Sequence, residues 1–456
     1  MNVFRRRNII AAGAFSAALF STGAFATNGY FAHGYSMAEK GVAGAGVAFS
    51  QDSLAAATNP AGMVMVGNRA DLGVSLFSPN REYQVKGGPS ATPGTCPGNP
   101  ATCPFSLIPG TYESDNTAFL IPSFGYNHML DAMSSIGISV YGNGGMNTEY
   151  TNGKATSALI GGQQNGTYGD GDTGVDLGQL FFTTTYSRKY QEASSWGASL
   201  IVAYQWFEAK GLNNFASFSQ SSSDLSGNGH DKSWGYGAKF GIQQSVSKAL
   251  VLGASYQTKI NMQEFDDYKG LFAQQGGFDI PATGTIGFAL KTTPTSTLVL
   301  DVQKIWYSEI DSVGNSFNPA FTNCAGTVFT GGSASSSPYC LGGNKGVGFG
   351  WEDMTIVKLG FQWAGDPGWI WRVGYSKGDQ PIPSSEVLFN ILAPAVMEEH
   401  ITFGFTKEMG KSNELTFAAM YAPEQEVSGP NPLDPAQRIT LKMYQYDLGV
   451  SWAWKF

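Results

Sequence analysis

Charged residues are scarce in this sequence, and histidine and cysteine are rarer still. Asp, Glu, Lys and Arg make up 14% of the 456 residues, against the ~25% typical of soluble domains. The four histidines lie far apart, at positions 33, 128, 230 and 400, which argues against a cluster of metal ligands. Beyond the N-terminus, no segment approaches the ~18–20 uninterrupted apolar residues of a membrane-spanning helix.

The sequence also singles out no nucleophile together with its base. The glycine-rich GVAGAG at 41–46 is followed by Phe49 where a dinucleotide-binding loop needs a third glycine. No strand pattern precedes that segment. We therefore expect neither an enzyme nor a cofactor. The net charge of −8 argues against nucleic acid as a partner.

The first 26 residues have the three parts of a secretory signal. Arg5, Arg6 and Arg7 precede an apolar core over 9–20, and Ala24-Phe25-Ala26 fits a small-residue cleavage site. A permanent anchor would need a longer apolar core. We predict cleavage after Ala26 and export of the remaining chain.

The sequence is rich in what strands and turns use, with 59 glycines and 13% aromatic residues. In the last thirteen residues, YQYDLGVSWAWKF, apolar side chains occupy the even positions and polar or small ones the odd positions. Successive strand side chains point to opposite faces, so this segment predicts a strand with one apolar face. Similar alternation recurs and gives fourteen predicted strands in all, near 69–77, 117–127, 135–142, 177–188, 196–207, 234–243, 249–260, 284–291, 296–307, 354–363, 369–376, 400–407, 414–422 and 444–456.

The connections between these strands alternate between short turns and long polar loops. Long loops are expected near 84–116, 150–175, 211–232, 262–282, 311–351, 380–397 and 424–441. An even number of strands with this alternation is typical of a bacterial outer-membrane barrel. A secreted β-sandwich or β-solenoid is the alternative, but it would not explain the alternation of loop lengths. We predict an all-β, antiparallel transmembrane barrel of about 14 strands over 69–456.

Residues 27–68 show no strand period and read as short helices. Ser36 and Glu39 have capping-box spacing, Asp52 or Ser53 could cap a second helix, and Asn59-Pro60 would end it. The apolar content of this segment argues against a free periplasmic tail. We predict an N-terminal, mainly helical plug in the barrel lumen.

The four cysteines form two local pairs, each in a segment rich in Gly, Pro, Ser, Thr and Asn. An exported protein can form disulfides, and a metal site would lack nearby histidines. We therefore predict the disulfides Cys96–Cys103 and Cys324–Cys340, each stabilising a loop.

The segment VAFSQDSLAAATNPAGM, with Asn59, Pro60 and Ala61, resembles the plug of the FadL/TodX family of outer-membrane transporters for long-chain fatty acids and other hydrophobic compounds. The expected strand count, a glycine-rich third strand (Gly142, Asn143, Gly144, Gly145) and the terminal Phe456 extend the resemblance over the mature chain. It implies a monomer in the outer membrane, surrounded by lipid and lipopolysaccharide, with Phe456 read by the barrel-assembly machinery.

The resemblance also implies that a kink in the third strand opens the barrel wall. Substrate would bind in apolar pockets and leave sideways into the membrane, driven by diffusion. Glycines in a strand tolerate a bulge, although these could simply begin an outer loop. Asn59-Pro60-Ala61 would be part of the plug or gate, and its plainer interpretation is a helix stop.

A fatty-acid substrate would favour a cationic partner for its carboxylate. Arg372 is the best candidate because an Arg recurs at this place in the fatty-acid transporters and can bind a carboxylate with two bonds; Lys239, Lys259 and Lys358 are further candidates. Alternatively, these cations balance lumenal acids such as Asp301 and Asp447. Aromatic or aliphatic hydrocarbons are an alternative substrate class. A general porin and a structural or adhesive surface barrel are alternative functions.

Overall fold

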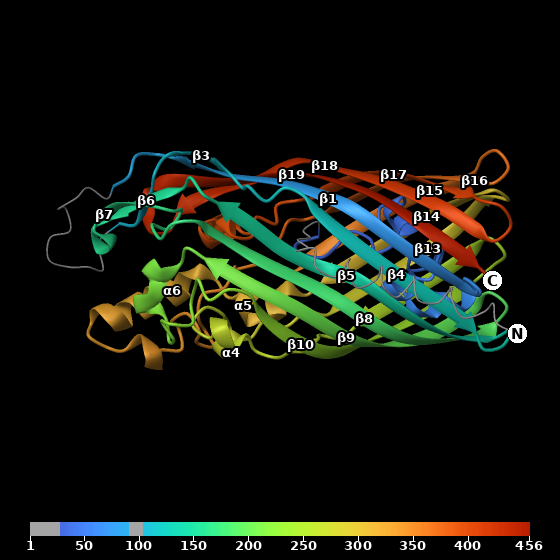
Figure 1. Cartoon of the computed structure of the whole chain (residues 1–456), viewed down its shortest axis with the longest axis horizontal. Helices are drawn as coiled ribbons and strands as arrows, with labels where there is room; N and C mark the ends of the chain where they lie inside the picture. The colour runs from blue at the N-terminus through green and yellow to red at the C-terminus, as the bar shows by residue number, and fades with distance from the viewer. Residues whose placement is uncertain (1–27, 91–103) are drawn as a thin grey trace, which may run out of the picture.

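A computed structural model of the chain describes residues 28–90 and 104–456. The expected signal segment, the cleavage site after Ala26, and the expected Cys96–Cys103 pair lie outside the described residues. Figure 1 shows long strands wrapped around a lumen, with helices gathered at one end and the C-terminus at the other.

Fourteen antiparallel strands form a closed barrel, as the alternating sequence pattern predicts. The last strand pairs with the first over its whole length, from Arg69↔Lys455 to Lys86↔Arg438, so the sheet has no free edge there. The barrel strands are β1 (Arg69–Lys86), β4 (Phe119–Met129), β5 (Ser134–Tyr150), β8 (Thr173–Gln191), β9 (Ser194–Lys210), β10 (Asp231–Ser245), β11 (Leu250–Gln257), β13 (Thr283–Thr293), β14 (Ser296–Ile305), β15 (Met354–Ala364), β16 (Trp369–Gly378), β17 (Glu399–Glu408), β18 (Asn413–Asn431) and β19 (Asp434–Lys455).

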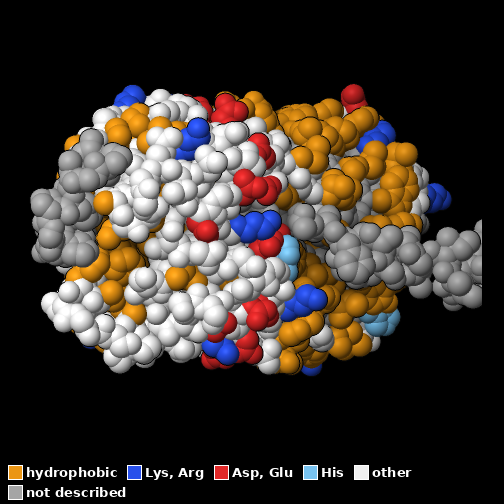
Figure 2. Space-filling model, turned by 60° about the vertical axis from the view of Figure 1, so that its left-hand side comes forward, with side chains coloured by type: hydrophobic (Ala, Val, Ile, Leu, Met, Phe, Trp, Pro, Cys, Tyr) orange, Lys and Arg blue, Asp and Glu red, His pale blue; other side chains and the backbone are white. Residues whose placement is uncertain are grey.

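The two faces of each strand meet different surroundings. In β19, Leu448, Val450 and Trp454 are exposed on the outer surface, whereas Gln445 and Asp447 are buried in the lumen. Figure 2 shows hydrophobic side chains over one half of the molecule and mostly polar surface over the other, with acidic and basic groups at the boundary. This is the surface expected where the barrel meets lipid and its loops meet water.

The loops at the end opposite the C-terminus carry the remaining elements. These are β2 (Ser106–Leu107), β3 (Gly110–Glu113), β6 (Lys154–Ser157), η3 (Ala158–Ile160), β7 (Gly162–Asn165), η4 (Asn213–Phe218), β12 (Asn261–Met262), η5 (Asp266–Tyr268), α4 (Ala273–Gly276), η6 (Tyr307–Glu309), α5 (Asp311–Gly314), α6 (Phe317–Phe329), η7 (Ala334–Ser336), η8 (Ser384–Glu386) and η9 (Phe389–Ile391). Within the described ranges, no helix has the length and apolar character needed to span a membrane.

The prediction of a long loop over 424–441 is wrong. β18 and β19 continue through this segment and pair as far as Asn431↔Asp434, with a bulge between Ala422 and Gln425. Pro430 lies within this paired segment, opposite Arg438, because a strand tolerates proline where no ladder hydrogen bond is required of it. The expected loop over 84–116 is also partly strand, since Gly110–Glu113 pairs with β1.

Residues 28–68, here called the plug, lie inside the barrel toward the end where the C-terminus lies (Figure 1). The plug contains α2 (Met37–Lys40), α3 (Ala55–Thr58) and η1 (Pro60–Met65). The side chain of Ser36 accepts from the Glu39 N–H at 3.2 Å, and that of Asp52 accepts from the Leu54 N–H at 3.0 Å. Ser36 is thus the N-cap of α2 and satisfies a main-chain donor at a buried helix end. The expected cap of the second helix by Asp52 or Ser53 is wrong, because α3 begins after Leu54 and has no side-chain cap.

Candidate functional site

Asn59 fastens the plug to the barrel wall. Its Nδ2 donates to the carbonyl oxygens of Val47 (2.6 Å), Ile242 (3.1 Å) and Ala254 (3.4 Å), and its Oδ1 accepts from Ala61 N–H at 3.0 Å. Ser187 and Ser195, on two adjoining strands, both donate to the Ala61 carbonyl. The Asn59-Pro60-Ala61 motif therefore both ends α3 and connects the plug to strands of the wall.

The third barrel strand, β5, departs from its neighbour β4 halfway along. The β4–β5 ladder ends at Ser123↔Tyr141, although β5 continues to Tyr150. Beyond this pair, β4 presents Pro122, which has no N–H to donate. On β5 the register against β8 shifts between Gly142 and Gly144, so Asn143 is an extra residue in the strand. The glycine-rich segment thus coincides with a gap in the β4–β5 pairing.

The N-terminal end of the plug takes the place of β4 beside this part of β5. Ala32 N–H donates to the Asn143 carbonyl, and Gly145 N–H donates to the Tyr30 carbonyl, both at 2.9 Å. The Asn143 side chain is buried and donates to Gln179 Oε1 at 2.9 Å. The main-chain groups freed by the gap are therefore bonded to a segment of plug rather than to another strand.

An apolar pocket, here called the outer pocket, lies among the tops of the strands and the long loops. Its cavity volume is ≈ 30 Å³, and a water needs roughly 10–15 Å³ of such volume. A hydrocarbon can enter only if side chains move apart. The lining residues are Val175, Phe207, Leu212, Phe215, Leu225, Leu271, Phe272, Ser312, Leu341, Val347, Gly348, Phe349, Phe389 and Leu392.

Aromatic rings connect the outer pocket to the plug. Phe272, in the pocket, lies 4.8 Å from Phe278, and Phe278 lies 6.1 Å from Tyr30 between ring centroids. Tyr30 in turn contacts Tyr307 (5.1 Å) and Trp351 (5.8 Å). Rings at these separations are in van der Waals contact, so an apolar path runs from the loops to the residues that bond to β5.

A second pocket, here called the gap pocket, lies where the β4–β5 ladder ends. Its cavity volume is ≈ 20 Å³, enough for one small polar group. It combines apolar and polar side chains from the plug and from four strands. The lining residues are Ala32, His33, Gly34, Tyr35, Met37, Lys40, Ser75, Phe77, Ile121, Pro122, Ser123, Tyr141, Gly142 and Asp447.

The candidate cations lie apart from the outer pocket. The Arg372 Nε donates to Gln51 of the plug at 2.9 Å and its Nη1 to Thr406 at 2.7 Å. Lys358 Nζ donates to the carbonyls of His33 and Gly44, at 3.3 and 3.4 Å.

Two further candidate cations are also engaged. Lys239 Nζ donates to the Ala57 carbonyl, and Lys259 is half-exposed and pairs with Asp279 at 3.0 Å. The structure thus gives Arg372, Lys239 and Lys358 a part in holding the plug. Lys358 also lies directly opposite Asp301 in the β14–β15 ladder, which is consistent with the expectation that these cations balance lumenal acids. Asp301 accepts from the Gly46 and Val47 N–H groups, and Asp447 pairs with Lys40 of the plug.

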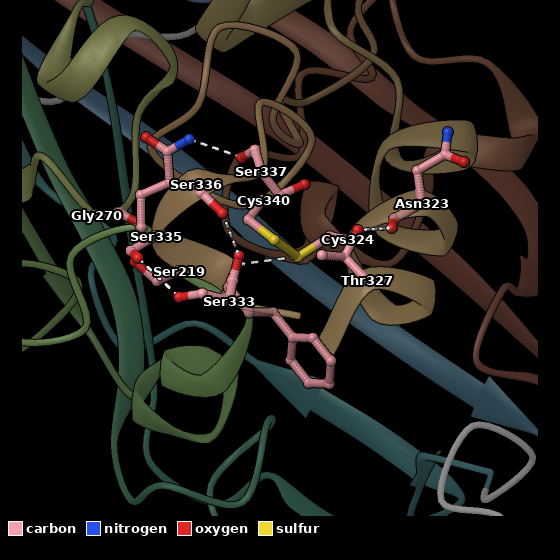
Figure 3. Close-up of a disulfide and its surroundings, with 12 residues drawn as sticks. Ser219, Gly270, Asn323, Cys324, Thr327, Ser333, Ser335, Ser336, Ser337 and Cys340 are labelled. Carbon is pink, nitrogen blue, oxygen red and sulfur yellow. Dashed lines mark hydrogen bonds between the residues drawn. A yellow bond between two sulfur atoms is a disulfide. The ribbon is translucent and has the colours of Figure 1, made fainter. Parts of the chain in front are cut away.

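A disulfide joins Cys324, in α6, to Cys340 (Figure 3). Directly after Cys340, Leu341 N–H donates to the Phe218 carbonyl at 2.9 Å, and Leu341 lines the outer pocket. Ser312, Val347 and Phe349 of the same loop also line it. The disulfide therefore fastens a loop that covers the outer pocket, here called the lid (residues 311–351).

One acidic group of the plug is buried without a cation bonded to it. Glu39 is 3% exposed, and its Oε2 accepts from the Tyr35 N–H at 3.4 Å. Desolvation by burial, with Asp52 nearby, raises the pKa of Glu39 to about 8. At neutral pH this carboxyl is therefore largely protonated in the folded protein.

Sequence reasoning missed the residues that build the aromatic path. Tyr30 and Trp351 lie in segments without a period, and Tyr307 lies at the end of a predicted strand, so nothing in their spacing indicated that they meet. Pro122 was included in a predicted strand, and a proline inside a strand is the signal that could have indicated the end of the ladder.

Comparison with known proteins gives one family and several similar structures. Residues 17–431 match the family described as outer membrane protein transport protein (OMPP1/FadL/TodX). No curated protein matches the sequence. The toluene transporter TodX of Pseudomonas putida has a TM-score of 0.64 at 16% identity, covering 93% of this chain and 99% of that one.

Two further solved structures are similar at comparable coverage. A FadL homologue of Pseudomonas aeruginosa has a TM-score of 0.63 at 14% identity, covering 94% of this chain and 100% of that one. The toluene transporter TbuX of Ralstonia pickettii has a TM-score of 0.59 at 15% identity, covering 93% of this chain and 99% of that one. At these identities the structures establish a shared fold.

Proposed function

This chain belongs to the OMPP1/FadL/TodX family of outer membrane transport proteins, and from that membership we propose that it takes up small, uncharged hydrophobic molecules by diffusion. Substrate enters the outer pocket, passes along the aromatic rings, and leaves sideways into the membrane at the gap between β4 and β5. The plug, which we assign to residues 27–68, blocks the direct path through the lumen.

The lining of the outer pocket carries this proposal. Among the described residues that line it, none is charged, and the one hydroxyl, of Ser312, already donates to the Gly277 carbonyl. Burying apolar surface stabilises a bound hydrocarbon by ~25 cal/mol per Å². A carboxylate in the same place would lose hydration without gaining a cation.

The positions of the candidate cations support an uncharged substrate over a fatty acid. Arg372 and Lys358 are occupied by groups of the plug or wall, and Lys259 is on the surface with Asp279. A fatty-acid carboxylate would have to displace one of these contacts. Aromatic compounds also suit the path, because rings can stack on Phe272, Phe278 and Tyr30.

Lateral release is supported by the end of the β4–β5 ladder at Ser123↔Tyr141 and the extra residue Asn143. A closed sheet gives a hydrophobic molecule no way through the wall. At the gap, the plug segment around Tyr30 to Ala32 bonds to the main chain of β5 from within, and Tyr35 donates to the Asn143 side chain. Movement of that short segment would connect the lumen with the membrane.

Uptake by cells tests the proposal. Cells lacking the chromosomal copy, with and without this gene, would be given labelled toluene and labelled oleate. We expect gene-dependent uptake of toluene and little of oleate. Deletion of Asn143 removes the extra residue, restores the register against β8, and should lower toluene uptake toward that of cells without the gene. Deletion of Gly88, an exposed loop residue, is the matched control.

The alternative functions predict different results. A general porin would admit small sugars in a swelling assay, and the plug argues against it. A structural or adhesive barrel would leave both uptake rates unchanged, while deletion of the long loops would abolish attachment. Oleate uptake that depends on the gene and exceeds that of toluene would contradict an uncharged substrate but leave the gap in place.

A further inference from the structure

Three buried polar atoms that make no hydrogen bond within the described protein belong to residues of the gap pocket. They are His33 Nε2, Ser123 Oγ and Tyr141 Oη. The three residues are 2%, 6% and 1% exposed. Leaving a buried polar atom without a partner is unfavourable, so three such atoms on residues that line one small cavity favour a ligand group that bonds to them.

The three atoms come from different parts of the fold. His33 belongs to the plug, and Ser123 and Tyr141 are the last residues paired between β4 and β5. The gap pocket therefore lies at the point where the wall opens, on the proposed exit path. Apolar residues of the same pocket, including Phe77, Ile121 and Pro122, provide a surface for a hydrophobic body next to the polar group.

The hydrogen-bonding capacity of the pocket fits a hydroxyl group. His33 bonds to the main chain of Lys40, whereas its Nε2 makes no bond among the described residues; we therefore assign the ring proton to Nδ1, which makes Nε2 an acceptor. Burial, together with His400, Lys40 and Lys358, lowers the pKa of His33 well below its usual range, so the ring is neutral. A hydroxyl group both donates and accepts, as bonding to this nitrogen and to a hydroxyl of Ser123 or Tyr141 requires.

The charges in the pocket disfavour an anion. Lys40 Nζ is 2.6 Å from Asp447 Oδ2 and 2.9 Å from Ser75 Oγ, so its charge is already balanced. A carboxylate would meet Asp447 as a like charge and could not donate to His33. A cavity of ≈ 20 Å³ also matches one hydroxyl better than a carboxylate.

We propose that the gap pocket binds the hydroxyl group of hydrophobic alcohols and phenols, and so selects hydroxylated molecules among those that leave through the wall. This inference rests on the proposed exit path for its place in transport. The binding itself requires only the pocket.

The test compares p-cresol with toluene, because the two differ by one hydroxyl group. Binding of each is measured by equilibrium dialysis with the full-length protein in lipid nanodiscs, and uptake is measured in cells. The pocket variants are Tyr141→Phe and Ser123→Ala. Tyr150→Phe and Ser135→Ala are the matched controls, because these hydroxyls are also buried on β5 without a partner but do not line the pocket.

We expect Tyr141→Phe and Ser123→Ala each to lower the affinity for p-cresol relative to toluene about three- to tenfold, the worth of one hydrogen bond. The controls should leave that ratio unchanged. The proposal would be overturned if the affinity for p-cresol relative to toluene stayed constant in the pocket variants. It would also be overturned if this ratio fell equally in the control variants. Failure of toluene uptake in cells would count against the proposed function, whereas the p-cresol ratio in nanodiscs decides the hydroxyl site.

Discussion

Gly144 lies against the carbonyl oxygen of Tyr30, so closely that a Cβ at Gly144 would come within 1.9 Å of it. The two residues are far apart in the sequence, and their contact places the N-terminal end of the plug beside the kinked strand. Only glycine allows this approach. The contact connects the plug, the aromatic path and the gap in the wall.

Gly144→Ala should therefore displace the segment around Tyr30 from β5. We expect faster hydrogen exchange at the Ala32 and Gly145 amides, which bond across this contact, and a changed rate of toluene uptake. Gly326→Ala, in α6, is the control because a Cβ there meets nothing within 4 Å. Unchanged exchange at both amides in Gly144→Ala would contradict the role given to this contact.

Asn59→Ala should loosen the plug. The substitution removes three bonds to carbonyl oxygens and one from the Ala61 N–H, all made by a fully buried side chain. With each net hydrogen bond worth ~0.5–1.5 kcal/mol, we expect the plug to be destabilised by about 2–6 kcal/mol. Small sugars should then enter faster in a liposome swelling assay. Asn228→Ala, in an exposed loop, should leave the vesicles as tight as the parent protein does.

Removing the lid disulfide should weaken the outer pocket and spare the barrel. The double substitution Cys324→Ser with Cys340→Ser opens a loop of 16 residues, for which the loss is about 3 kcal/mol of constraint. We expect faster proteolysis within 311–351 and weaker binding of toluene, because Leu341 and Phe349 line the pocket. In gel electrophoresis, the folded barrel of the variant should keep the heat-modifiable migration of the parent protein. Toluene affinity equal to that of the parent protein would show that the lid does not shape the pocket.

The alternation of side chains predicted the fold well because it follows directly from strand geometry. The fourteen strands and the closure of β19 on β1 could be read from residues such as Leu448, Val450 and Trp454, whose period of two is set by lipid on one side and lumen on the other. The glycine-rich part of the third strand also coincides with the shift of register between Gly142 and Gly144, because glycine is needed where two main chains approach.

The site was less predictable because its contacts join segments that are distant in the sequence. Tyr30 meets Tyr307 and Trp351 only after the barrel has closed, and no spacing encodes that. The role expected for Arg372 was inferred from its charge and from the resemblance to fatty-acid transporters. Neither says which partner a buried guanidinium has, and here the partners are Gln51 and Thr406.

The buried carboxyl of Glu39 should make plug stability depend on pH. Burial is the main cause that raises the pKa of Glu39 to about 8 in the folded protein, from 4.5 for a solvated glutamate side chain. Between these values the folded state holds more protons than the unfolded state, so the free energy of unfolding falls as pH rises from about 4.5 to about 8. Asp52, whose pKa burial raises to about 6, acts in the same direction.

Glu39→Gln keeps the shape of the side chain and removes its titration. Hydrogen exchange of the plug amides, measured from pH 5 to pH 8 and corrected for intrinsic exchange, should show a weaker pH dependence in this variant. Glu352 is an exposed residue of the outer loops. The control variant Glu352→Gln should show the same dependence of plug-amide exchange on pH as the parent protein. Equal slopes in Glu39→Gln and the parent protein would mean that Glu39 is ionised in the folded plug.

Arg372→Gln separates the two substrate classes. A carboxylate-binding Arg372 would make this variant lose oleate uptake selectively, with toluene uptake spared. The geometry predicts otherwise, because Arg372 donates to Gln51 of the plug and to Thr406 of β17 and is 3% exposed. We expect the ratio of oleate to toluene uptake to stay the same, and small sugars to leak faster as the plug loses this contact. Lys259→Gln, on the surface beside Asp279, should change neither measurement. A selective loss of oleate uptake in Arg372→Gln would restore the fatty-acid carboxylate as the ligand of this residue and would require Gln51 to give up its bond when substrate arrives.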